Sequence, residues 1–225
     1  MSNLAEERRY TYADYIKWDE DTRYELIDGV AYAMAAPSRL HQKINMELSR
    51  QLSNFLRGKP CEVYAAPFDV RLNAESYDDI VVQPDILVVC DESKHDGGSV
   101  TGAPDFIVEI LSPKNTKHDT DVKFRLYQKA GVKEYWIVNP FRRTVEVYIL
   151  RGGKYGAGKI YVDNDAISVY TLPGCKINMA DVFYDIESDI NENESIYKQK
   201  IIEALKKNDL YSEQISKIIE NIKIT

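Results

Sequence analysis

The chain has 225 residues, 44% of them hydrophobic and 29% charged, which is typical of one globular domain with an appendage. No run of about 18 apolar residues occurs and residues 1–9 mix acidic with basic side chains, so we expect no membrane span, no signal peptide and a cytoplasmic location. The formal net charge of −7 excludes a surface that is positive throughout, which weighs against a nucleic-acid enzyme.

Helix and hairpin signals dominate the first quarter of the chain. Thr11 can cap a short helix that runs to Trp18. Residues 24–34 form two apolar runs around the Asp28-Gly29 dipeptide, which predicts a β-hairpin. Residues 37–58 then predict a longer helix that begins at the Pro-Ser pair, ends at the glycine and repeats apolar residues every three or four positions.

The central part of the chain alternates strands with one helix. We expect strands at residues 63–72, 80–89, 106–111, 135–138 and 144–150. Between the third and fourth of these, Asp119 or Thr120 can cap a helix that runs to Ala130 and stops at Gly131. This order predicts an α/β fold.

The last third of the chain has weaker patterns. Short strands are expected around Tyr161 and Val169, followed by a brief helix at residues 180–183. Beyond Asp185 we expect an acidic connector and two short amphipathic helical segments, one around Ile201 and one around Ile218, as a helical hairpin or oligomerisation element. The predicted division is a core domain at residues 10–185 and a helical extension at residues 186–225.

Charge and cysteine are unevenly placed. Between Lys114 and Lys133 six bases stand against two acids, a balance of +4, whereas ten acids stand against six bases from Asp181 onward. The basic stripe formed by residues 114–133 fits a polyanionic substrate, although a solvated helix face has a similar composition.

The three cysteines, Cys61, Cys90 and Cys175, show no CxxC spacing. We therefore expect them to be reduced and buried, without a zinc site or a disulfide framework.

Two acids interrupt apolar runs that are expected to be strands. Asp85 lies within residues 81–89 and Glu109 lies within residues 106–111. Burying a neutral polar group without a hydrogen-bond partner costs about 2–7 kcal/mol, and burying an ionised carboxylate without a partner costs more. If the two strands are neighbours, a hard divalent cation such as Mg²⁺ between the acids would remove their repulsion. A single acid in a strand can also be a rim residue.

A lysine and a third acid occupy similar positions. On a helical wheel Lys123 falls about 100° from Val122, in the middle of an apolar half that includes Leu126 and Tyr127. Such a lysine needs a carboxylate or phosphate partner, unless its amine reaches solvent. In the hairpin, strand alternation places Glu25 on the face that points inward.

The histidines carry less information. His41, near the start of the longer helix, is more often a capping or packing residue and is kept as a weak candidate, and His95 lies in a polar loop. Asp85, Glu109 and Lys123 carry charges of opposite sign in segments that are expected to be buried. One shared site explains all three better than three unrelated occurrences do.

Six segments resemble one family of bacterial nucleases. The resemblance rests on residues 24–29, 66–72, 82–85, 102–113, 123–127 and 131–140, and it extends over residues 10–183. These segments are similar to the Uma-type restriction endonucleases of the PD-(D/E)XK nuclease superfamily.

The resemblance implies a restriction-endonuclease-like central mixed β-sheet flanked by helices. It implies that Asp85 is the metal-binding aspartate, Glu109 the second acid and Glu25 an upstream acid of the metal shell. One departure is that Leu111 stands where the superfamily has a lysine, and Lys123 on the following helix is the position that matches.

The expected activity is Mg²⁺-dependent hydrolysis of DNA phosphodiester bonds, with Mn²⁺ able to substitute for Mg²⁺. A homodimer is expected for an enzyme that cuts two strands. One alternative is an inactive DNA-binding or regulatory module of the same fold. A glycosidase is disfavoured because it has no use for a buried lysine between its acids, and only Trp18 and Trp136 could line a sugar cleft.

Overall fold

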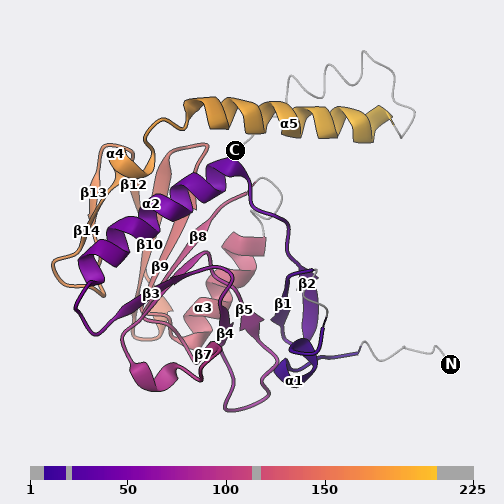
Figure 1. Ribbon diagram of the computed structural model, residues 1–225, viewed down its shortest axis with the longest axis vertical. Coiled ribbons are helices and arrows are strands. Elements are labelled where there is room, and N and C mark those ends of the chain that lie inside the picture. The colour runs from indigo at the N-terminus through magenta and orange to yellow at the C-terminus, as the bar shows by residue number, and fades with distance from the viewer. Residues whose placement is uncertain (1–7, 19–21, 113–117, 207–225) are drawn as a thin grey trace.

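A mixed sheet forms the centre of the computed structural model, which describes residues 8–18, 22–112 and 118–206 (Figure 1). Its strands lie in the order β11-β10-β9-β8-β6-β3, and β12 also pairs with β10. Only β8 and β9 run parallel in this sheet. The bounds are β3 (Glu62–Ala65), β6 (Ile86–Val89), β8 (Phe106–Ile110), β9 (Glu134–Asn139), β10 (Thr144–Arg151), β11 (Lys154–Tyr155) and β12 (Lys159–Val162). The expected mixed α/β architecture is confirmed.

A second mixed sheet has the order β2-β1-β5-β4-β7. The predicted hairpin supplies its first two strands, and Asp28 and Gly29 at the turn have φ angles of 49° and 76°, as a tight hairpin turn requires. The bounds are β1 (Tyr24–Ile27), β2 (Val30–Ala33), β4 (Asp69–Arg71), β5 (Val81–Val82) and β7 (Ser99–Thr101). A separate two-stranded sheet consists of β13 (Ala166–Ser168) and β14 (Lys176–Asn178).

Two segments that were expected to be single strands are each divided between the two sheets. Residues 63–72 form β3 and β4 with the cis Ala66-Pro67 peptide between them, and residues 80–89 form β5 and β6 with Pro84 between them. Proline has no N–H to donate to a sheet, so a central strand cannot continue through it. Asp85 therefore lies in a break between two strands and not inside one, which corrects the expectation from the sequence.

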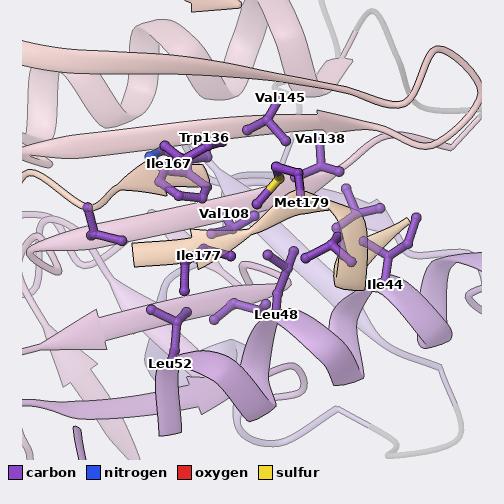
Figure 2. Close-up of a cluster of buried hydrophobic side chains, with 14 of the residues drawn as sticks. Ile44, Leu48, Leu52, Val108, Trp136, Val138, Val145, Ile167, Ile177 and Met179 are labelled. Atoms are coloured by element: carbon purple, nitrogen blue, oxygen red, sulfur yellow. The ribbon is translucent and has the colours of Figure 1, made fainter. Parts of the chain in front are cut away.

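Helix α2 (Arg39–Leu56) covers one face of the central sheet. The Ser38 side chain caps it by accepting a hydrogen bond from the amide of His41 at 3.2 Å. Figure 2 shows Ile44, Leu48 and Leu52 pointing from this helix into a core that also contains Val108, Trp136, Val138, Ile177 and Met179. This is the amphipathic helix predicted from the apolar spacing. Helix α4 (Met179–Val182) packs against α2, and the other short helical elements are α1 (Tyr12–Tyr15) and a 3₁₀ turn at Glu92–Lys94.

The opposite face of the central sheet packs against α3 (Phe124–Ala130). A π-helical turn, His118–Lys123, precedes α3, and Gly131 ends it with a φ of 94°. Val122, which the wheel placed on the apolar half, is 39% exposed. A π turn closes an i→i+5 hydrogen bond and holds more residues than an α turn, so the wheel is out of phase there.

The cysteine expectation is wrong for two of the three residues. Cys61 and Cys90 form a disulfide, whereas Cys175 is free and buried. Glu62 pairs with Val89 across β3 and β6, so the next residues outward, Cys61 and Cys90, face each other. This proximity follows from strand register, which cysteine spacing does not reveal.

Beyond the core, α5 (Glu187–Lys206) is one continuous helix where a connector was expected (Figure 1). Asp189 joins it to α2 through an ion pair with Lys43 at 2.9 Å and another with Arg39. The second predicted helical segment, around Ile218, lies outside the described residues. The two-domain division stays a prediction. None of the described helices is both long enough and apolar enough to cross a membrane.

Candidate active site

Lys123 joins two acids that come from different sheets. Its Nζ lies 2.9 Å from Oε1 of Glu25 on β1 and 3.0 Å from Oε1 of Glu109 on β8. All three side chains are almost completely buried, with the residues 3–4% exposed. Each charge thus has an opposite charge within direct contact, which offsets the desolvation of the group. Three of the four candidate residues are in this cluster.

Tyr127 is a further member of the cluster that the sequence interpretation treated only as core. It lies one helical turn after Lys123, and its hydroxyl donates a hydrogen bond of 2.6 Å to Oε1 of Glu109. Burial raises the pKa of Tyr127 well above its ordinary value, and the negative charges of Glu109 and Glu25 raise it further. The phenol is therefore a neutral donor at pH 7. The sequence signal that could have identified Tyr127 as part of the site is its position four residues after the buried Lys123.

Asp85, the fourth candidate, is fixed next to this cluster by a different set of groups. Its Oδ2 accepts hydrogen bonds from the amide of Ile110 at 2.7 Å and from the ring of His41 at 3.1 Å. Its main-chain carbonyl accepts from the Asn45 side chain at 2.9 Å and the Ala66 amide at 3.1 Å. None of the described contacts of Asp85 is with the lysine or the other two acids. The aspartate and the Glu-Lys-Glu cluster are thus adjacent but not bonded.

Strand register explains why Asp85 is adjacent to the cluster. Ile86 pairs with Val108 across β6 and β8, and extending the antiparallel pairing by one position places Asp85 opposite Glu109. Directly opposed residues on antiparallel strands have Cβ atoms about 4.5–5.5 Å apart. The bond from the Ile110 amide holds the aspartate carboxylate beside the strand that carries Glu109.

A polar network supports the strand break next to Asp85. The amide of Gln83 donates to Oε1 of Glu25 at 2.9 Å. The Gln83 side chain accepts from Arg23 at 2.7 Å and donates to Tyr15 at 3.1 Å and to Asp69 at 2.9 Å. Every polar atom of this amide is used, so the network fixes the chain between β5 and β6. Gln83 lies in residues 82–85, one of the segments that carry the family resemblance, but the sequence predicted no role for its side chain.

The donor set fits a hard divalent cation. Three carboxylates and one ammonium give formal charges of −3 and +1, so Glu25, Asp85, Glu109 and Lys123 carry −2 together. Oxygen ligands suit Mg²⁺, which commonly uses one or two carboxylates and keeps several waters. The described part of the chain contains no group of three or more His, Cys, Asp or Glu side chains close enough to hold a metal. Asp85 and Glu109, which the extended β6–β8 pairing places opposite each other, are the two acids to consider for an ion that keeps several waters.

The predicted basic stripe is only partly available to a ligand. Lys123 is buried in its ion pairs, and Lys133 contacts Asp105 at 2.6 Å. Arg125 and Lys129 are exposed on α3. Lys114 and Lys117 lie outside the described residues. The net charge of +4 in residues 114–133 therefore overstates the positive charge that these residues offer to a ligand.

The mixed sheet has helices on both faces, two buried acids within β1 and β8, and a third acid at the break before β6, and comparisons with known proteins assign this arrangement to a nuclease-like fold. The model of the Uma2 family, described as "putative restriction endonuclease", matches residues 12–180. The chain belongs to this family. The match includes all four candidate residues and ends before α5.

Two individual relatives are similar to the chain. An uncharacterized protein of Synechocystis sp. is 30% identical over 139 residues, which is 60% of this chain and 71% of the relative. A crystal structure described as a "putative nuclease belonging to DUF820" from Anabaena variabilis has a TM-score of 0.63 and 19% identity, covering 77% of this chain and 97% of the other. At that identity the second likeness supports the fold alone.

Proposed function

We propose that this protein is a metal-dependent endonuclease that hydrolyses DNA phosphodiester bonds at the site formed by Glu25, Asp85, Glu109 and Lys123. The observation that carries the proposal is the buried lysine held between Glu25 and Glu109, at 2.9 and 3.0 Å, next to a third acid. The family and the fold support the reaction class.

Asp85 and Glu109 would hold Mg²⁺, or Mn²⁺ in its place, with the carbonyl of Ile110 as a further oxygen ligand. The bound ion supplies polarisation of the phosphate and a lower pKa for an attached water. Glu25 would complete the shell or hold a second ion. Glu25, Asp85 and Glu109 together have a formal excess of two negative charges over Lys123, which a divalent ion would neutralise.

Lys123 would orient the nucleophile or stabilise the negative charge that develops on the phosphoryl oxygens. A donor fixed in a dry site is effective in this role because it needs no reorganisation during the reaction. Glu25 and Glu109 both contact the Lys123 ammonium, and the Tyr127 hydroxyl also donates to Oε1 of Glu109. Exposed Lys129 on α3 would contact a neighbouring phosphate.

Cleavage of supercoiled plasmid with Mg²⁺ or Mn²⁺ tests the proposal. We expect activity in the unmodified chain and its loss, about 100-fold or more, in Asp85→Ala, Glu109→Gln and Lys123→Ala. Asp181→Asn and Lys176→Ala change exposed residues outside the site and serve as matched controls for charge. Equal cleavage by all five variants and the unmodified chain would remove the assignment.

An inactive DNA-binding or regulatory module is the second candidate. The observation that favours it is that Lys123 already neutralises part of the acidic cluster, while Leu111 stands at the usual lysine position. Calorimetric titration with Mn²⁺ separates the two candidates, since a binding module needs no cation. A DNA duplex that is retained in a gel shift without Mn²⁺ uptake supports the module.

A homodimer is part of the proposal because one site cuts one strand at a time. Light scattering after size-exclusion chromatography measures the mass directly, and a value near twice 25.8 kDa supports it. If the protein is a monomer that nicks plasmid without linearising it, the homodimer proposal is wrong and the enzyme cuts only one strand of the duplex.

A further inference from the structure

The His41 ring contacts Asp85, and this contact is separate from the capping bond that the His41 amide makes at the start of α2. The residue lies in the first turn of α2, where its amide already bonds the capping oxygen of Ser38. Its ring nevertheless turns inward, and Nε2 lies 3.1 Å from Oδ2 of Asp85. Both side chains are largely covered, with 12% of the His41 side chain and 15% of the Asp85 side chain exposed. The ring is therefore part of the wall around Asp85.

The hydrogen-bond network fixes which ring nitrogen carries a hydrogen. Oδ2 of Asp85 also accepts from the Ile110 amide, and an ionised carboxylate can only accept, so Nε2 of His41 is the donor. The other ring nitrogen, Nδ1, is buried without a hydrogen-bond partner among the described residues.

The two donors on Oδ2 determine the orientation of the Asp85 carboxylate. With His41 and Ile110 both on Oδ2, none of the hydrogen bonds among the described residues uses the second oxygen, Oδ1, which can take another ligand. Asn45, one turn further along α2, holds the main-chain carbonyl of the same aspartate at 2.9 Å. The first two turns of α2 thus fix both the side chain and the backbone of Asp85.

We propose that His41 is a positioning residue of the active site, whose Nε2–H holds Oδ2 of Asp85 so that Oδ1 faces the divalent cation. This inference rests on the proposed function, since it assigns a role toward the same cation. Hydrogen bonds from neighbouring groups to ligating carboxylates commonly contribute about 10- to 100-fold to metal affinity. His41 itself contacts neither the cation nor the phosphate.

Mn²⁺ affinity, measured by calorimetry on the full chain, tests the role independently of catalysis. We expect His41→Ala and His41→Phe to weaken Mn²⁺ binding by about 10- to 100-fold. His41→Gln can present an amide N–H to Oδ2 and should bind within about threefold of the unmodified chain. The phenylalanine variant fills the space of the ring without a donor, so it separates the hydrogen bond from packing.

Leu52→Ala is the matched control, because Leu52 is buried on the same helix three turns away and its truncation loosens α2 without touching the site. We expect it to lower the melting temperature and leave Mn²⁺ affinity unchanged. Unchanged affinity in His41→Ala, failure of His41→Gln to restore binding, or equal loss in Leu52→Ala each overturns the inference. If the unmodified chain itself takes up no Mn²⁺, the proposed function fails and this role with it.

Discussion

Asp85 directly precedes β6, where the β6–β8 pairing extended by one position places it opposite Glu109, yet different helical layers hold the two carboxylates. Helix α2 provides the His41 ring to Asp85 at 3.1 Å. The π turn and α3, on the other face of the sheet, provide Lys123 and Tyr127 to Glu109. The site therefore depends on both layers, and a cation shared by the two acids would join them.

Cation binding should consequently stabilise the fold. A ligand that binds only the folded state adds about 2.7 kcal/mol at a concentration 100 times its dissociation constant. We expect the melting temperature to rise with added Mn²⁺ in the unmodified chain and to stay constant in Asp85→Asn. Ca²⁺-free buffer with matched ionic strength controls for general salt effects. A rise of equal size in Asp85→Asn would place the ion elsewhere.

Replacement of Lys123 should destabilise the protein strongly. Lys123→Met keeps the length of the apolar stem but leaves Glu25 and Glu109 buried without their shared cation. Breaking a buried ion pair from one side costs about 3–5 kcal/mol. Urea unfolding at pH 7 measures the loss, and Lys129→Met on the exposed side of the following helix α3 is the control. A difference below about 1 kcal/mol would mean that water reaches the two acids.

Tyr127→Phe should cause a smaller loss and change the response to alkali. Removing the hydroxyl deletes one donor to a buried carboxylate, which costs about 1.5–3 kcal/mol. Because the pKa of Tyr127 is raised in the folded state above its ordinary value of 10.0, the unfolded chain loses this proton first as the pH rises. Stability is then fully present below about pH 10 and falls above it.

The measurement is the urea midpoint of Tyr127→Phe and of the unmodified chain at about pH 9 and pH 11. We expect Tyr127→Phe to have a lower urea midpoint than the unmodified chain at the lower pH, and a smaller decrease in midpoint between the two pH values. Burial also raises the pKa of Tyr15, Tyr148 and Tyr155, so part of the alkaline loss should remain in the variant. Identical slopes for both proteins would contradict the assignment to Tyr127.

The sequence predicted elements whose signals are local. Apolar spacing located α2 within two residues at each end, and the Asp28-Gly29 dipeptide located the β1–β2 turn. The wheel placed Lys123 on the buried side of its helix, and the residue is 3% exposed. Its two acidic partners could be suggested but not measured, because the strand register that brings β1 and β8 near the helix is a property of the whole fold.

Features that depend on pairing between distant segments were missed. Two strands were expected to continue through Pro67 and Pro84, although proline cannot donate in a sheet, and both segments pass from one sheet to the other there. The Cys61–Cys90 disulfide likewise follows from the β3–β6 register. The positions of Asp85 and of the surrounding Gln83 network depend on the second break, which composition alone does not reveal.

Asp189 should control how firmly α5 is attached to the core. Its carboxylate is completely covered, and it pairs with Lys43 at 2.9 Å and with Arg39, two bases of α2 whose side chains are 38% and 66% exposed. The hydrogen bond from Lys43, supported by Arg39, lowers the pKa of Asp189 and so keeps it charged at neutral pH. This contribution is present above the ordinary pKa and is lost as the pH falls through the lowered value.

Asp189→Asn retains the size of the side chain and removes its charge. We expect amide hydrogen exchange in α5 to accelerate about two- to fivefold, as for the loss of a partly exposed ion pair, while exchange in β8 and β9 stays unchanged. Asp181→Asn, at an exposed position on α4, is the control. If α5 exchanges at the same rate in both variants, its attachment depends on the apolar contacts of Ile186 and Ile190, which are buried in the α2 core.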